Sequence, residues 1–183
     1  MATRKTSSSL LSNLALLYDS YGGLHRALLS AYTAVSVVVT GLVWRLAFEN
    51  EWCGYSISIL PTLAGFTIAA YALLFSVLSD KSRQALSAPA PELNNRSPLL
   101  TLAGSITHAV VVQIMGLLIA LVFLAKPFPR LPNMDWLADG VNVVTAFGGL
   151  FFLVYGILLV VASALTVFRL LAIVAKIDGR PVG

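Results

Sequence analysis

Charged residues are scarce in this chain. Only 11% of its 183 residues are Asp, Glu, Lys or Arg, whereas 58% are hydrophobic, and the mean hydropathy is +0.86. Soluble domains carry about 25% charged residues. Since too little polar surface remains to cover a fold in water, the composition excludes an ordinary soluble domain and indicates a protein of the lipid bilayer.

The sequence also lacks the clusters of reactive side chains that catalysis and metal binding need. Cys53 is the single cysteine, which excludes an intrachain disulfide and any multi-cysteine metal site. The only histidines are His25 and His108, and no HExxH, CxxC, GxSxG or phosphate-binding glycine loop occurs. We therefore expect a non-enzymatic protein with no catalytic residues, no cofactor and no metal site.

Long uncharged segments predict the fold class. Backbone polar groups in lipid must bond to one another, so only helices and closed barrels cross a membrane. The apolar runs here are continuous rather than alternating, which favours helices. A span needs about 20 mostly apolar residues. We expect an all-α integral membrane protein whose four-helix bundle covers 28–168, with spans near 29–48, 57–78, 102–124 and 142–168.

Helix-breaking residues mark the expected ends of these spans. Trp52, Cys53 and Gly54 interrupt the apolar pattern after the first span, and Pro61 is expected near the outer end of the second. Prolines punctuate the connection before the third span and the connection after it, because proline cannot continue a helical hydrogen-bond ladder. The connection at 80–99 is expected to be a loop.

A periodic apolar stripe runs through the N-terminal segment, 1–27, and on to the start of the first expected span. Its members recur in alternating steps of four and three, and they are Leu10, Leu14, Leu17, Tyr21, Leu24 and Leu28. This spacing predicts an amphipathic helix. The helix is expected either to lie in the cytoplasmic membrane interface or to pack against the bundle or a neighbouring subunit.

The distribution of lysine and arginine predicts the orientation. With the N-terminus inside, nine of the twelve basic residues fall on the cytoplasmic side: Arg4, Lys5, Arg26, Lys81, Arg83, Arg96, Arg169, Lys176 and Arg180. The outer side holds Arg45, Lys126 and Arg130. This bias places both termini, including a tail at 169–183, in the cytoplasm. All three tryptophans, Trp44, Trp52 and Trp136, are expected to mark the outer interface.

His108 and Gln113 are the most polar residues expected inside the membrane. Five helical residues separate them, which turns their side chains about 140° apart, so we expect them to face different neighbours. Interhelical hydrogen bonding is the favoured interpretation. A pore lining or a pH-sensitive contact is the alternative.

Small residues recur at helical spacing in three of the expected spans. Small side chains four residues apart let helices approach closely. The residues expected to pack helices in this way are Gly65, Ala69, Gly116, Ala120, Gly149 and Gly156. They indicate a tight bundle or a homo-oligomer.

The second expected span resembles a known family. Its sequence Leu60-Pro61-Thr62-Leu63-Ala64-Gly65-Phe66 resembles the Leu-Pro-x-Leu-x-Gly-Phe pattern of small multi-span proteins from bacterial antiphage defence loci. With four expected spans and little soluble mass, the chain is most similar to the membrane subunit of the Kiwa system. The resemblance covers roughly 20 residues plus the architecture and transfers no functional residue. It implies a bacterial inner-membrane oligomer that senses phage and works with a soluble DNA-binding partner.

Two functions remain open at this point. The first is a membrane sensor or scaffold of antiviral defence, without direct nucleic-acid binding, that acts with a soluble cytoplasmic effector. The residues expected to dock such an effector are Arg83, Arg96, Arg169, Lys176 and Arg180; alternatively, they serve only topology and lipid headgroups. The second function is a small oligomeric channel, or a toxin or lysis protein that permeabilises the membrane.

Overall fold

The computed structural model describes residues 10–21, 29–91, 95–125, 135–177 and 179. Within these residues every regular element is an α-helix, and no β-strand forms. The helices are α1 (Leu10–Tyr21), α3 (Ala31–Leu42), α4 (Arg45–Phe48), α5 (Glu51–Val77), α6 (Asp80–Ser87), α7 (Pro98–Leu124) and α8 (Asp135–Ile177).

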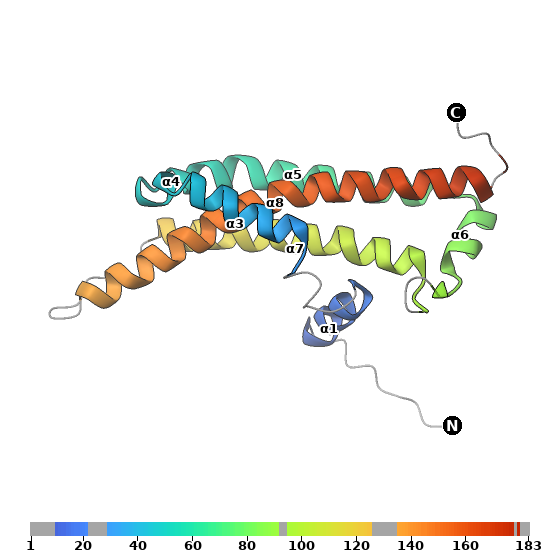
Figure 1. Ribbon diagram of the computed structural model, residues 1–183, viewed down its shortest axis with the longest axis horizontal. Helices are drawn as coiled ribbons and strands as arrows, with labels where there is room; N and C mark the ends of the chain where they lie inside the picture. Colours follow the sequence, from blue (N-terminus) through green and yellow to red (C-terminus); the bar gives the residue numbers. More distant parts are fainter. Residues whose placement is uncertain (1–9, 22–28, 92–94, 126–134, 178, 180–183) are drawn as a thin grey trace, which may run out of the picture.

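Three long helices, α5, α7 and α8, run alongside one another in alternating directions (Figure 1). Helices α5 and α7 have 27 residues each, which corresponds to about 40 Å. All three are long and apolar enough to cross a membrane. We call the two ends of this bundle the α6 end, where α8 finishes, and the α4 end, where α5 starts.

The first expected span is built differently from the other three. Helix α3 has 12 residues, or about 18 Å, which is short of the roughly 30 Å of hydrocarbon. The chain then tightens, because the amide of Leu46 donates to the carbonyl of Val43 at 3.0 Å, a three-residue step. Helix α4 follows and ends at Phe48. Since only three described helices reach spanning length, the four-span topology stays a prediction.

The interruption expected at Trp52, Cys53 and Gly54 is wrong. These residues form the first turn of α5. The chain reverses just before them, at Asn50, which adopts a left-handed conformation with φ 57°. Asparagine tolerates this region better than most residues. Pro61 also lies inside α5 rather than near its end, which membrane helices tolerate because neighbouring groups satisfy the freed carbonyl.

The connection expected as a loop at 80–99 contains helix α6. The hydroxyl of Ser79 accepts from the amide of Ser82 at 3.1 Å and caps α6. Ser97 caps α7 in the same way, and its hydroxyl donates to the carbonyl of Leu86 at 2.9 Å. Pro98 then starts α7, four residues before the expected boundary. These caps fix α6 across the end of the bundle.

Helix α8 extends beyond the expected span at both ends. It has 43 residues, or about 65 Å, and the segment expected as a tail from 169 is helical to Ile177. Figure 1 shows that α8 bends between its orange first part and its red second part. Adjacent glycines, Gly148 and Gly149, permit such a bend. A straight helix of this length would exceed the bilayer.

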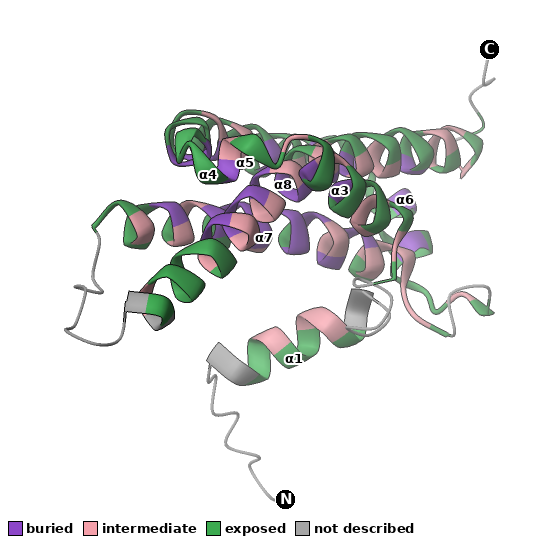
Figure 2. Cartoon of the chain, turned by 60° about the vertical axis from the view of Figure 1, so that its left-hand side comes forward, coloured by how far each residue is buried: buried purple, intermediate pink, exposed green. Residues whose placement is uncertain are grey.

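The helices expose apolar side chains and bury polar ones. Phe66, Val144 and Phe168 are 67%, 73% and 72% exposed, and green exposed residues cover the outward faces of the helices in Figure 2. The buried polar residues are Ser36, Thr40, Ser56, Thr67, Ser82, His108, Gln113 and Ser163. In water this arrangement would be unfavourable, whereas lipid solvates the apolar surface. Together with the three long apolar helices, it indicates a membrane protein.

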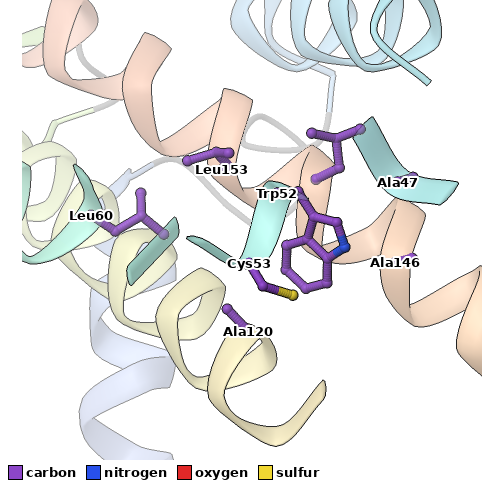
Figure 3. Close-up of a cluster of buried hydrophobic side chains, with 8 residues drawn as sticks. Ala47, Trp52, Cys53, Leu60, Ala120, Ala146 and Leu153 are labelled. Carbon is purple, nitrogen blue, oxygen red and sulfur yellow. The ribbon is translucent and has the colours of Figure 1, made fainter. Parts of the chain in front are cut away.

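A hydrophobic cluster around Trp52 holds the α4 end together (Figure 3). The Trp52 side chain is fully buried and packs against Phe123 of α7, with 5.3 Å between ring centroids. The expectation that Trp52 marks the membrane interface is therefore wrong, since its indole belongs to the core. Trp44 and Trp136 are 49% and 74% exposed, so the interfacial role stays a prediction for them.

Candidate functional site

Two of the buried hydroxyl groups bond within their own helix. Ser36 donates to the carbonyl of Tyr32 at 2.7 Å, and Thr67 donates to that of Leu63 at 2.8 Å. Such local bonds satisfy a polar group in lipid without joining two helices. His108 and Gln113 differ from these residues because their side chains bond to another helix, and they form the candidate site.

His108 lies in the first half of α7 and contacts two other helices. Its Nε2 atom is 3.2 Å from the hydroxyl of Tyr155 on α8. Its ring also meets the ring of Tyr18 on α1 edge-on, with centroids 5.8 Å apart. The imidazole is 4% exposed. His108 therefore links the N-terminal helix to the interior of the bundle.

Gln113 also bonds α7 to α8, at Gly156, the residue that follows Tyr155. Its amide nitrogen donates to the carbonyl of Gly156 at 3.2 Å, and its amide oxygen is buried without a hydrogen-bond partner. The expectation that His108 and Gln113 face different neighbours is wrong, because both bond to α8. The glutamine side chain is long enough to reach α8 although residue spacing turns it about 140° away from His108. These two bonds are the interhelical arrangement favoured from the sequence.

Four of the six small residues expected to pack helices are buried. A Cβ atom on Gly116 would lie 2.9 Å from Leu60, and one on Gly156 would lie 3.1 Å from it. A Cβ atom on Gly149 would overlap the ring of Trp52. Ala120 is 0% exposed. These contacts bring α5, α7 and α8 within close reach of one another.

Gly65 and Ala69 behave differently from the other four. Both are exposed on α5, and a Cβ atom added to Gly65 would meet nothing within 4 Å. Within one chain this pair packs no helix. Its spacing matches that of Gly116 and Ala120, so the sequence pattern alone did not separate an inward pair from an outward one.

Two of the expected docking residues are engaged within the chain. Arg83 on α6 donates through Nη2 to the carbonyl of Phe75 at 3.2 Å, close to the end of α5. Arg96, just before α7, forms an ion pair with Asp19 of α1 at 3.1 Å. Both guanidinium groups thus hold neighbouring elements at the α6 end.

The other expected docking residues lie toward the C-terminus. Arg169 and Lys176 are exposed on α8, and Arg180 lies outside the described residues. Helix α8 ends at the same side as α6 (Figure 1), so Arg169 and Lys176 share an end of the bundle with Arg83 and Arg96. The structure therefore brings four of the five residues to one end.

Sequence reasoning missed the partners of the candidate site. Tyr155 lies 47 residues from His108, and Asp19 lies 77 residues from Arg96. No local spacing predicts such pairs. The apolar stripe of 1–27 pointed to α1 itself, and half-buried Leu14, Leu17 and Tyr18 now face the bundle. Of its two expected roles, packing against the bundle is the one with observed contacts.

The contacts of these groups connect helices to one another. Among the described residues, no three His, Cys, Asp or Glu side chains gather where they could hold a metal ion. The polar contacts instead form a path from α1 through His108 to Tyr155. Comparisons with protein-family models, with characterised proteins and with solved structures found no match to this chain.

Proposed function

We propose that this chain is a non-enzymatic membrane sensor or scaffold that acts with a soluble cytoplasmic partner. In this proposal it crosses a bacterial inner membrane four times, with both termini in the cytoplasm, and works as a homo-oligomer. The α6 end then faces the cytoplasm, because the basic residues gather there. The similarity of Leu60–Phe66 in order and type to a defence-associated pattern extends the proposal to antiphage defence.

The path from α1 to α8 carries this proposal. Tyr18 touches His108, His108 reaches Tyr155, and Asp19 pairs with Arg96 beside them. A shift of α8 within the membrane would change the contacts of His108, and hence the position of α1. A device that converts a membrane event into a movement at the cytoplasmic face needs such a two-ended contact.

Phage plating tests the proposal as a whole. Cells carrying the gene with its genomic neighbours are expected to reduce plating, and the double variant Arg169→Glu, Lys176→Glu is expected to abolish protection. Both residues are exposed, so their reversal leaves the core intact. The control is Arg45→Gln at the α4 end, which loses only an exposed ion pair with Glu49. Protection that survives the double reversal at equal abundance rejects cytoplasmic docking.

Reporter fusions test the topology. Reporters at residue 1, within 82–95 and at the C-terminus are expected to read cytoplasmic, while reporters near Glu51 and Asp135 read outside. If only the three long helices crossed the membrane, the N-terminal and C-terminal reporters would read on opposite sides. The experiment therefore separates three spans from four, and an odd number contradicts the proposal.

A charge swap tests the role of α1. Arg96→Asp is expected to release α1, because it removes the ion pair between Arg96 and Asp19 and leaves two like charges in its place. Adding Asp19→Arg restores the opposite charges and should restore protection from phage together with resistance of 10–21 to protease. Failure of the double variant to recover, where both single variants are inactive, would show that the pair does not position α1.

A further inference from the structure

A cavity of about 430 Å³ lies where α5 and α8 run side by side, with one residue of α7 at its inner wall. This volume falls within the range of small-molecule sites, about 300 to 1,000 Å³. Neither His108 nor Gln113 lines this α5–α8 cavity, and none of the expected docking residues does. It is therefore a feature separate from the candidate site.

Uncharged and mostly apolar side chains form the walls of the cavity. None of the residues that line it is charged. Phe66 of α5 and Phe168 of α8 both line it and are 67% and 72% exposed, so each of these two helices offers an open aromatic ring. Aromatic rings prefer offset-stacked or edge-on contacts with other rings. These walls favour an uncharged ligand that contains a flat ring.

Two hydroxyl groups interrupt this apolar lining, Thr67 on α5 and Ser163 on α8. Thr67 donates its proton to the carbonyl of Leu63 at 2.8 Å. Ser163 is 8% exposed, and within the described part of the chain its hydroxyl has no hydrogen-bond partner, unlike Thr166, which donates to Ala162. A hydroxyl left unbonded among apolar groups is unfavourable. A ligand with an acceptor oxygen in the cavity would remove that cost.

The depth of the cavity limits which acceptor can reach Ser163. Helix α5 is long and apolar enough to cross a membrane, and Thr67 lies ten residues before its end at Val77, or about 15 Å. The hydrocarbon layer is about 30 Å thick, so the cavity lies near its middle. Phospholipid ester groups stay at the interface and bring no acceptor to this depth. A neutral carbonyl group on an apolar ring can enter hydrocarbon and supply one.

We propose that the α5–α8 cavity binds a neutral, lipophilic molecule with a flat ring that carries a carbonyl group, the chemistry of a quinone. The ligand enters from the lipid, its ring lies against Phe66 and Phe168, and its carbonyl oxygen accepts a hydrogen bond from Ser163. The inference goes beyond the proposed scaffold function and does not rest on it. It concerns a site within the bilayer, whereas partner docking concerns the cytoplasmic face.

Equilibrium dialysis of the full chain in nanodiscs, against empty nanodiscs of the same lipid, tests the proposal. The probe is 2,3-dimethyl-1,4-naphthoquinone, whose methyl groups block addition of the Cys53 thiol to the quinone ring. Its control is 2,3-dimethylnaphthalene, which has the same rings without carbonyl groups. Empty nanodiscs give the ligand concentration in lipid, to which both affinities refer. The quinone is expected to bind saturably and about fivefold more tightly than the hydrocarbon, the effect of one hydrogen bond.

Removing the hydroxyl group tests its role as donor. Ser163→Ala is expected to weaken the quinone about fivefold and to leave the affinity of the hydrocarbon unchanged, because only the quinone accepts a hydrogen bond. The matched control is Ser76→Ala. Ser76 is an exposed serine of α5 that donates to the carbonyl of Leu73 and does not line the cavity. This control should leave both affinities unchanged.

Filling the cavity tests the location of the bound ligand. Ala164 lines the cavity and is exposed, so Ala164→Phe adds bulk there without entering the core of the bundle. It is expected to abolish the binding of both compounds. Val161→Phe adds a ring to the same part of α8, at a residue that is 51% exposed and does not line the cavity. Both compounds should bind this control as they bind the unchanged chain.

Any of four results overturns the proposal. Equal affinity for the quinone and the hydrocarbon would assign the cavity to acyl chains of the lipid. Unchanged quinone affinity in Ser163→Ala would exclude the hydroxyl as donor, and binding that persists in Ala164→Phe would place the ligand elsewhere. The fourth result is the absence of saturable quinone binding; if Ala164→Phe then also removed crosslinked oligomers, a second copy of the chain would be the occupant.

Discussion

Gly149→Ala should lower the free energy of unfolding by about 1 to 3 kcal/mol, the cost of overpacking a core. The added methyl group would overlap the ring of Trp52, which is fully buried and packs against Phe123. Gly148→Ala is the matched control, because its Cβ atom would meet nothing within 4 Å. That control should be neutral or slightly stabilising, since alanine favours helix over glycine. Unfolding in mixed detergent and SDS micelles, followed by tryptophan fluorescence, measures both.

A second-site change identifies the cause. Trp52→Phe removes the outer ring atoms that the new methyl group would strike, although it costs stability on its own by leaving a cavity. The double variant with Gly149→Ala should lose less unfolding free energy than the two single variants lose together. The reason is that the added methyl group fills part of that cavity. Strictly additive losses, or equal damage from Gly148→Ala, would show that the contact between Gly149 and Trp52 does not limit stability.

The helical class follows from the sequence because lipid leaves the backbone few choices. The composition predicted membrane helices, and the regions around 57–78, 102–124 and 142–168 are helical. The predicted helix boundaries were less accurate. An uncharged stretch of sequence indicates which residues lie in lipid, but it does not indicate where the helical hydrogen bonds end. Helix α8 continues past Arg169 to Ile177, because a charged residue on a helix surface does not end its ladder.

The role of Trp52 could not be predicted from its type. Tryptophan is common both at membrane interfaces and in tightly packed cores. What decides between them is the reversal at Asn50, which turns the start of α5 onto α7 and α8. A left-handed residue is a local event that the surrounding composition does not reveal.

The polar contacts of the core were predicted only in kind. His108 and Gln113 were expected to bond between helices, but their partners depend on how α7 crosses α8. The spacing of His108 and Gln113 along α7 predicted different directions for their side chains. Their partners, Tyr155 and Gly156, are nevertheless adjacent residues of α8. Side-chain length and the crossing of two helices decide such contacts, and neither is encoded in the spacing of a single segment.

The outward glycine on α5 provides the sharpest test of the proposed homo-oligomer. Gly65 and Gly156 were both expected to pack helices, but only Gly156 has close neighbours within the chain, with Leu60 at 3.1 Å and Gln113 at 3.3 Å from an added Cβ atom. Gly156→Leu should therefore damage the fold of a single chain. Gly65→Leu should leave that fold intact, because nothing lies within 4 Å.

Gly65→Leu is then expected to remove oligomers without lowering monomer stability. A leucine on the exposed face beside Ala69 prevents the close helix approach that small residues allow between copies. Crosslinking in native membranes measures the oligomer, and unfolding in SDS measures the fold. Gly41→Leu is the control on α3, since Gly41 is also exposed and open, and it should leave crosslinking unchanged. Full crosslinking in Gly65→Leu would show that copies do not meet at this face of α5.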